Sequence, residues 1–296
     1  MKYEKKQFTK YIVFSFVFAW ILQIIASVFA INGNVVAFKL ILAVVMFIPL
    51  LAVICARIPL KGLGWKPRVK GKVKYIILGI LIPAALTVTG ALLFFLVFPK
   101  SFDMTGEMLR LQAGEEALKI MEAQGITVPM YLIIATVQCL TIAPFINMFT
   151  AIGEEAGWRG VMYPMLKDKF GVTKGRILGG VSWGIWHWPI IALAGYEYNV
   201  SIFDNPIKSV LGMLLFCVFA TCMGIFIDEL YEKTNIIWVP ALAHGAINAM
   251  ATIPIYMLKE SYADKMMIGP ATIGILSGIP LIILAIWICR KTSLKK

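Results

Sequence analysis

Two adjacent glutamates and an arginine interrupt a chain that is otherwise mostly apolar. Glu154, Glu155 and Arg159 lie in the stretch GEEAGWRG. The preceding segment, residues 128–152, carries no charge. An ionisable side chain inside a membrane-spanning helix is costly, so its presence indicates a functional site by default. A segment suited to lipid that ends in these three residues therefore predicts a reactive centre.

The two histidines of the chain also lie inside apolar segments. His187 is about ten residues past the start of its segment, which at the rise of an α-helix puts it about 15 Å deep. His244 is about eight residues past the start of its own segment, or about 12 Å deep. The glutamates lie at a similar distance from the same side of the membrane. We therefore expect three helices to bring Glu, His and His into one layer.

The spacing within each segment favours distinct chemical roles. Glu155 and Arg159 are four residues apart with the glutamate first, which is the favoured orientation for an ion pair on a helix. Glu154 is rotated by about 100° from Glu155, so it is free to face a cavity. His244 and Asn248 are also four residues apart, and an imidazole beside an amide can donate two hydrogen bonds to one developing oxyanion. Each of these residues alone is often structural, but together they indicate a catalytic set: Glu154, Glu155, Arg159, His187, His244 and Asn248.

The elements that must position this set are membrane-spanning helices. Of the 296 residues, 60% are hydrophobic and only 15% are charged. Apolar stretches of about 20 residues recur along the whole chain, as bilayer-spanning helices require. We predict an all-α, polytopic membrane protein forming a single integral domain, residues 1–296, with a motif-bearing core at about 128–250. The predicted helices, about eight in number, cover residues 10–31, 35–56, 75–98, 128–150 with a continuation through Glu155, 177–196, 208–228, 236–258 and 268–289.

The net charge of +12 follows the predicted topology. Most Lys and Arg residues fall in loops on one side of the membrane, with the densest run at 57–74, whereas the opposite loop at 99–127 is acidic. The positive-inside rule then places both termini in the cytoplasm. The basic charge indicates topology and contact with anionic membrane lipid, and no nucleic-acid partner. We expect an integral protein of a bacterial cell (plasma) membrane with a site accessible from the cytoplasmic side; the oligomeric state stays open.

The longest segment between predicted spans has an amphipathic pattern. Asp103 or Thr105 could cap a helix there, and the methionines and leucines of 103–124 form an apolar stripe opposite its charged residues. This pattern predicts a helix lying on the outer membrane surface. Whether the segment covers a cavity as a lid is left open.

Three ordered motifs resemble a known protease family. They are EExxxR at 154–159, an aromatic residue four positions before His in 183-WGIWH-187, and HxxxN at 244–248. The set resembles the CPBP (CAAX protease and bacteriocin-processing) family of intramembrane proteases, related to the type II CAAX prenyl endopeptidases. One departure is Trp183 where Phe is usual, and we expect it to change packing and not chemistry.

The resemblance implies a role for each motif residue. Glu154 with His187 would activate the water that attacks the scissile carbonyl, His244 with Asn248 would stabilise the oxyanion, and Glu155 with Arg159 would hold the site in shape. The same residues leave the cofactor open, because Glu154, His187 and His244 are also a sufficient zinc ligand set. Asn is a poor zinc ligand but a good oxyanion donor, which favours a metal-free mechanism, with Zn²⁺ as the alternative.

The preferred interpretation is an intramembrane endopeptidase acting on a membrane-associated or lipidated (CAAX-like) protein or peptide. Two alternatives remain. Intramembrane Glu and His residues also relay protons in proton-coupled transporters, although the chain has no inverted repeat of the kind that such transporters carry. A non-catalytic bacteriocin-immunity or peptide-binding protein would keep the same fold without hydrolysis.

Overall fold

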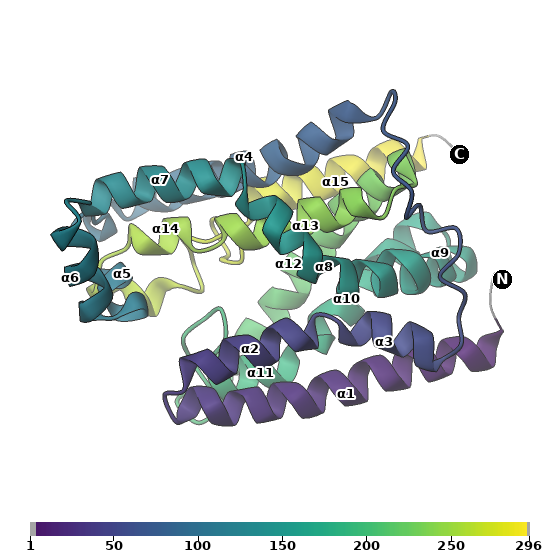
Figure 1. The fold of residues 1–296 in the computed structure, drawn as a ribbon, viewed down its shortest axis with the longest axis horizontal. Coiled ribbons are helices and arrows are strands. Elements are labelled where there is room, and N and C mark those ends of the chain that lie inside the picture. Colours follow the sequence, from purple (N-terminus) through teal and green to yellow (C-terminus); the bar gives the residue numbers. More distant parts are fainter. Residues whose placement is uncertain (1–3, 295–296) are drawn as a thin grey trace.

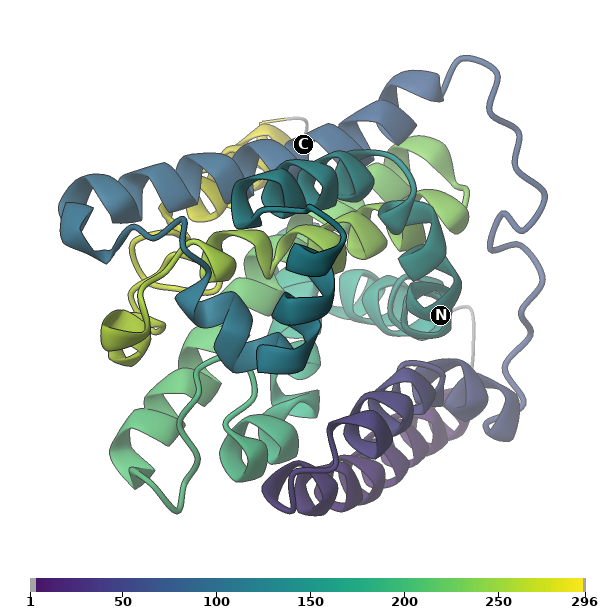
Figure 2. The same ribbon diagram turned by 60° about the vertical axis from the view of Figure 1, so that its left-hand side comes forward.

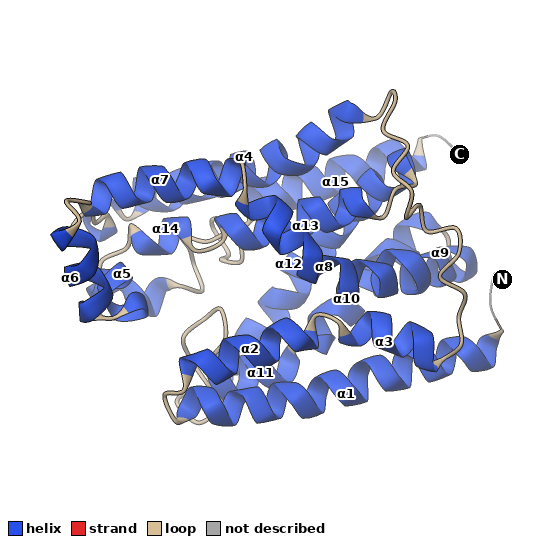
Figure 3. Cartoon of the chain, viewed as in Figure 1, coloured by secondary structure: helices blue, strands red, loops and turns tan. Residues whose placement is uncertain are grey.

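The structure is a computed structural model that describes residues 4–294, and helices account for nearly all of its regular structure (Figures 1 and 3). The one β-bridge within that range joins Phe102 to Leu258. This confirms the all-α prediction. The α-helices are α1 (Lys5–Ile31), α2 (Val35–Val45), α3 (Ile48–Cys55), α4 (Val73–Val97), α5 (Glu107–Ala113), α6 (Glu115–Ala123), α7 (Val128–Leu140), α8 (Ala143–Gly157), α9 (Tyr163–Phe170), α10 (Val172–Trp186), α11 (Trp188–Ala194), α12 (Pro206–Thr234), α13 (Trp238–Met250), α14 (Ile253–Tyr256) and α15 (Ile279–Ser293).

The motif-bearing helices form the centre of the bundle. Helix α13 packs against α8 and α4, and α10 packs against α12. The antiparallel pair of α1 with α2 and α3 covers one side, where α3 contacts α8 and α1 contacts α11 (Figure 1). Helix α15 packs against α12 on another side. The central helices are thus held between peripheral ones whose outer apolar side chains, such as Val36, Leu96 and Ile133, are exposed as lipid contact requires.

Five helical segments within residues 4–294 are long and apolar enough to cross a membrane. They are α1, α2 with α3, α4, α10 with α11, and α12; a sixth would result if α6 and α7, bent by 94°, formed one span. Membrane-crossing helices are therefore confirmed, whereas the predicted number of eight is not.

Prolines explain where the structure departs from the predicted spans. The segments predicted at 35–56, 128–150, 177–196 and 236–258 are each broken into two helices. In each case the second helix has a proline in its first turn: Pro49, Pro144, Pro189 and Pro254. Proline lacks the backbone N–H and disrupts a preceding helical turn, but it is well tolerated at a new helix start. Residues 268–278, predicted as the start of the last span, form turns before α15 begins at Ile279.

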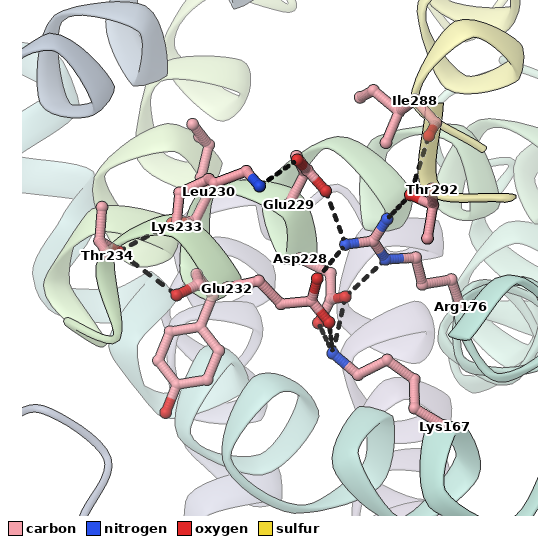
Figure 4. A network of polar contacts seen from close by, with 11 residues as sticks. Lys167, Arg176, Asp228, Glu229, Leu230, Glu232, Lys233, Thr234, Ile288 and Thr292 are labelled. Atoms are coloured by element: carbon pink, nitrogen blue, oxygen red, sulfur yellow. Dashed lines mark hydrogen bonds and ion pairs between the residues drawn. The ribbon is translucent and has the colours of Figure 1, made fainter. Parts of the chain in front are cut away.

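A buried ion-pair network ties four helices together at one end of the bundle (Figure 4). Arg176 of α10 is fully buried and lies 2.7 Å from Asp228 of α12, which is also fully buried. Lys167 of α9 lies 2.8 Å from the same carboxylate. Arg176 also donates to Glu232 and, at 3.3 Å, to Thr292 of α15. The buried charges are stabilised because they pair with one another and make additional hydrogen bonds. The network therefore fixes how α9, α10, α12 and α15 meet.

The same end is closed by the long loop between α3 and α4, residues 56–72, which runs up one side of the molecule (Figure 2). We name this end of the bundle the basic end. Leu63 is 2% exposed and packs against Gly160, where an added Cβ would come within 2.9 Å of it. The Trp238 indole donates to the carbonyl of Trp65 at 2.9 Å. Helix α1 begins and α15 ends at this end (Figure 1).

The segment predicted as one amphipathic helix at 103–124 forms two short helices at the opposite end of the bundle, which we name the α5–α6 end. Gly114, with φ 88° and ψ 153°, separates α5 from α6. Asp103 accepts hydrogen bonds from the backbone N–H groups of Thr105, Gly106 and Glu107 at 2.7–3.0 Å and so satisfies donors at the start of α5, whereas the N-cap position itself is Gly106. Burial disfavours the ionised form of Asp103, but these bonds together with that from the Thr105 hydroxyl outweigh it and lower its pKa.

Candidate active site

Two glycines let the motif helices approach closely. Gly245 follows His244, and an added Cβ there would come within 2.6 Å of the Pro144 carbonyl of α8. Gly153 precedes Glu154, and an added Cβ there would come within 2.5 Å of the carbonyl of Met46. Larger side chains would separate α8 from α13 and from the junction of α2 with α3. The close packing brings the glutamates of α8 beside the histidine of α13.

Glu154 is held by two tryptophans. Its side chain is buried, and its Oε2 accepts hydrogen bonds from the indole N–H groups of Trp158 at 3.1 Å and Trp183 at 2.8 Å. Trp158 is one helical turn beyond Glu154, while Trp183 comes from α10. Both bonds use one carboxylate oxygen, and the residue lines the central cavity. The two indoles therefore orient the carboxylate and leave its second oxygen for a reacting group.

Glu155 joins the arginine to the second histidine. Its Oε1 lies 2.9 Å from Nη1 of Arg159 and 2.8 Å from Nδ1 of His244. Glu155 and Arg159 are both fully buried, and His244 is 4% exposed. The predicted ion pair between Glu155 and Arg159 is therefore present, and the carboxylate has the additional function of orienting the imidazole. Glu154 and Glu155 do have different partners, as their rotation on the helix predicts.

Arg159 lies in a widened helical turn and makes contacts with several neighbouring helices. Residues 158–162 form a π-helix, a geometry that is frequent at functional sites. The Arg159 guanidinium donates to the Gly224 carbonyl of α12 at 3.3 Å and lies over the rings of Tyr163 and Trp183, 4.6 Å and 5.0 Å from their centroids. A buried guanidinium is stabilised by such contacts. Arg159 thus locks α8 to both α10 and α12.

His187 lies at the junction between α10 and α11. Its Nδ1 is 2.9 Å from the carbonyl oxygen of Trp183. Its ring packs against Trp186 and Phe216, with centroids 4.8 Å and 4.7 Å apart. The break before Pro189 therefore places this histidine where its ring is fixed and its Nε2 edge is half-buried beside the cavity.

The partners of the two histidines determine which ring nitrogen reacts. A backbone carbonyl can only accept a hydrogen bond, so Nδ1 of His187 carries the proton. Nδ1 of His244 likewise donates to the Glu155 carboxylate. When neutral, each ring therefore has its lone pair on Nε2. For His244 to donate from Nε2 as well, the ring must carry a proton on both nitrogens.

These side chains surround a cavity of about 470 Å³. Glu154, His187, His244 and Asn248 all line it, with apolar side chains of α2 and α12 on the other walls. Asn248 is exposed to this space and lies one turn beyond His244. The structure therefore brings the six predicted residues together: four on the cavity wall, and Glu155 with Arg159 directly behind His244.

The sequence interpretation missed the function of the tryptophans. Trp183 was expected to alter packing alone, but its indole donates to Glu154, which a phenylalanine could not do. Its ring also lies against His244, with centroids 5.1 Å apart. The spacing of Trp158, four residues after Glu154, was the available signal for the second indole. The departure at Trp183 therefore changes the hydrogen bonding of the site.

Glu154, His187 and His244 are also the candidate ligands of a metal ion. Fixing Nδ1 of both histidines leaves Nε2 free, which suits metal ligation. However, no group of three His, Cys, Asp or Glu side chains in residues 4–294 comes close enough together to hold a metal ion. The described residues therefore show no preassembled metal site.

The cavity lies away from the loop at the basic end. None of its lining residues comes from the loop 56–72, α9 or the end of α12. A second space of about 530 Å³ shares Tyr196, Glu197 and Asn248 with it and is lined by Met108 and other residues of α5. The basic loops were expected to mark the side from which the site is reached. That expectation stays a prediction, because the described residues define no membrane side; the loop 56–72 packs over the basic end.

Comparisons with known proteins identify the segment that carries the site. Residues 136–250 match the family model for type II CAAX prenyl endopeptidase Rce1-like proteins. A stretch of 63 residues is 35% identical to CAAX prenyl protease 2 of Methanococcus maripaludis. This match covers 21% of the chain and 23% of that relative, so the chain aligns with less than a quarter of the relative's length. The segment 136–250, which carries every candidate residue, is therefore similar to the Rce1-like family of type II CAAX prenyl endopeptidases.

Proposed function

We propose that the protein is an intramembrane endopeptidase that hydrolyses a peptide bond of a membrane-associated or lipidated, CAAX-like protein or peptide. The observation that carries this proposal is the Glu154 carboxylate, fixed by two indoles on the wall of a cavity that His187, His244 and Asn248 also line. A buried base beside histidines and an amide is the arrangement that acyl transfer to water needs. The Rce1-like segment supports the same reaction class.

In the proposed reaction, Glu154 and His187 activate water. The free carboxylate oxygen of Glu154 takes a proton from a water molecule. At the same time the water oxygen bonds to the scissile carbonyl carbon, and the carbonyl oxygen becomes an oxyanion. Nε2 of His187 accepts a hydrogen bond from the same water and aligns it. The tetrahedral intermediate then expels the amine as the C–N bond breaks, and the proton held by Glu154 passes to the leaving nitrogen.

His244 and Asn248 stabilise the oxyanion in this scheme. The Asn248 amide donates one hydrogen bond, and the His244 imidazolium donates the other from Nε2. Glu155 holds that ring by Nδ1 and balances its charge, while Arg159 keeps Glu155 in place. Donors fixed in this way need little reorganisation as charge develops, which is why they lower the barrier.

We further propose that the reaction needs no metal. Zinc bound by Glu154, His187 and His244 is the alternative, and it predicts loss of cleavage on treatment with a zinc chelator and recovery on addition of zinc. Under the metal-free proposal, chelation leaves the rate unchanged while Glu154→Gln abolishes it.

The environment of the reaction is the membrane. We propose that the chain acts as one unit in a cell (plasma) membrane, in contact with membrane lipid and with no nucleic-acid partner. The positive-inside rule supports placing the basic end in the cytoplasm, and the cavity then opens toward the opposite face of the membrane.

Mass spectrometry of cleavage products tests the function. Purified protein in detergent is incubated with libraries of membrane peptides and isoprenylated tails, and wild type is compared with Glu154→Gln. A new peptide terminus made by wild type alone supports proteolysis. Glu122→Gln, on the exposed face of α6, is the matched control and should cleave normally. No cleavage by wild type across a broad library would contradict the proposal and favour a non-catalytic peptide-binding protein.

A further inference from the structure

One carboxylate outside the six-residue set also faces the cavity. Glu197 lies in the loop between α11 and α12 and lines both the central cavity and the space beside α5. It also lines a narrow crevice between α4, α12 and α13. Three spaces therefore meet at one acidic side chain, so a substrate that reaches Glu154 from the α5 side must pass Glu197.

The loop that presents Glu197 is firmly held. Tyr198 is 3% exposed, and its hydroxyl lies 3.3 Å from the Ile273 carbonyl. The N–H of Ile202 donates to the Ala192 carbonyl at 2.7 Å, which closes the loop back onto α11. Glu197 itself has φ 70°, a left-handed conformation that non-glycine residues adopt uncommonly. Anchors on both sides of Glu197 therefore fix its position relative to the cavity.

Glu197 has no cationic partner among the described residues. It takes part in none of the ion pairs found within residues 4–294, whereas the buried carboxylates Glu155 and Asp228 are each paired with an arginine. Burial raises the pKa of Glu197, and its one polar neighbour, the Tyr196 hydroxyl, lowers it in part. Glu197 is half-buried; partial loss of water without a cation is unfavourable for a carboxylate, and a positive charge brought by a ligand would stabilise it.

We propose that Glu197 is a subsite for a cationic group of the substrate, either the ammonium of a peptide N-terminus or the side chain of a Lys or Arg residue. The proposal rests on the proposed peptidase function, because it assigns Glu197 to the path that leads to Glu154. In this position a cation would be paired before the peptide bond reaches the reactive carboxylate, so Glu197 selects the substrate and does not take part in bond cleavage.

The other charges on these walls are compatible with this assignment. Lys39 of α2 lines the central cavity and is exposed, and no ion pair joins it to a carboxylate within residues 4–294. Glu154 is occupied by its two indoles on one oxygen. Beside α5 the outer space is lined by Met108, Leu111 and Gln112, which add no positive charge. Glu197 is therefore the carboxylate that an arriving cation meets first.

Binding of charged peptides tests this subsite without requiring cleavage. The probes are short fluorescent Ala/Leu peptides in which one position, scanned along the peptide, carries Lys, norleucine or Glu. Their affinity for the Glu154→Gln protein in detergent is measured by anisotropy. We expect Lys to bind at one position about tenfold more tightly than norleucine, and the preference to vanish in Glu154→Gln/Glu197→Gln. A Glu197→Lys exchange in the same background should reverse the preference toward the Glu peptide.

Asp204→Asn in the Glu154→Gln background is the matched control. Asp204 lies in the same loop and bonds Ser201, so its variant disturbs the loop without removing a cavity carboxylate, and it should keep the Lys preference. Equal affinity for the three peptides, or no binding of any, would overturn the subsite. So would a Lys preference that survives Glu197→Gln. A Glu197-dependent preference without any cleavage by wild type would instead retain the subsite and reject the proposed peptidase.

Discussion

At the scale of single residues, Trp183 is the side chain on which most of the site converges. It donates to Glu154, lies against His244 and under Arg159, and its carbonyl accepts from His187. Only the indole N–H is lost in Trp183→Phe, so the ring contacts are largely kept. Because a hydrogen bond to a charged group is worth about 1.5–3 kcal/mol, we expect kcat/KM to fall at least about tenfold, as measured with the peptide found by mass spectrometry.

A nearby tryptophan provides the control for that variant. Trp186 donates to the Ser15 carbonyl and has no hydrogen bond to Glu154. Trp186→Phe should therefore affect stability more than kcat. If Trp183→Phe cleaves at the wild-type rate, the indole bond does not position the base.

Glu155 is the second residue whose function can be isolated. In Glu155→Gln the side chain keeps its shape, but its charge, which pairs with Arg159 and faces Nδ1 of His244, is lost. We expect kcat to fall about 10- to 100-fold with little change in KM, since the loss affects oxyanion stabilisation and not substrate binding. Steady-state kinetics separates the two constants. A rise in KM at constant kcat would contradict this role.

At the scale of elements, the start of α5 depends on the ionisation of Asp103. Its pKa is lowered from 3.8 in the folded protein, so its contribution to stability is fully present above pH 3.8 and is lost as the pH falls through the lowered value. Asp103→Ala removes the carboxylate at all pH values and should cost about 1 kcal/mol. Amide hydrogen exchange at 105–110 should speed up in the variant at neutral pH, and in wild type only below pH 3.8 after correction for intrinsic rates.

The ion-pair network at the basic end should matter more to stability. Arg176→Met would leave the buried Asp228 with Lys167 as its remaining cation (Figure 4). Leaving a buried charge poorly paired costs about 3 kcal/mol or more. Unfolding of the purified protein in SDS measures this loss. Lys233→Met breaks a single ion pair between partly exposed side chains and should change stability by less than about 1 kcal/mol. Equal effects of the two variants would rule out a special role for the network.

At the scale of the whole molecule, the sequence predicted the fold class and the residues of the site, but not how they are supported. Apolar runs suffice to indicate membrane helices, and i, i+4 spacing predicted the bond between Glu155 and Arg159. The breaks within the predicted spans follow proline positions. Those prolines are visible in the sequence, but hydropathy alone does not predict a break at them. The indole bonds to Glu154 and the contact between Glu155 and His244 depend on packing between helices distant in sequence, which no periodicity reports.

The side from which the site is reached stays a prediction for a related reason. Depth along a helix can be counted from its sequence, but which end of a bundle is closed depends on loops. Leu63 and Trp65 of the loop 56–72 are part of that closure. Basic residues favour a cytoplasmic position for that loop, and the same loop packs over its end of the bundle. The charge pattern thus predicts orientation and says nothing about access.

Access from the α5–α6 end can be measured with cysteine labelling. Cysteines are placed singly at Gln112, on the outer space, and at Lys66, in the loop 56–72, after the five native cysteines are replaced by alanine. In sealed right-side-out vesicles, a membrane-impermeant maleimide should label Gln112→Cys directly and Lys66→Cys only after permeabilisation, because the positive-inside rule predicts a cytoplasmic basic end. A bulky maleimide at position 112 should also slow cleavage by obstructing the passage to Glu154, whereas the same label at position 66 should leave the rate unchanged. Inhibition by the label at position 66 alone would place the entrance at the basic end and reject the path past α5.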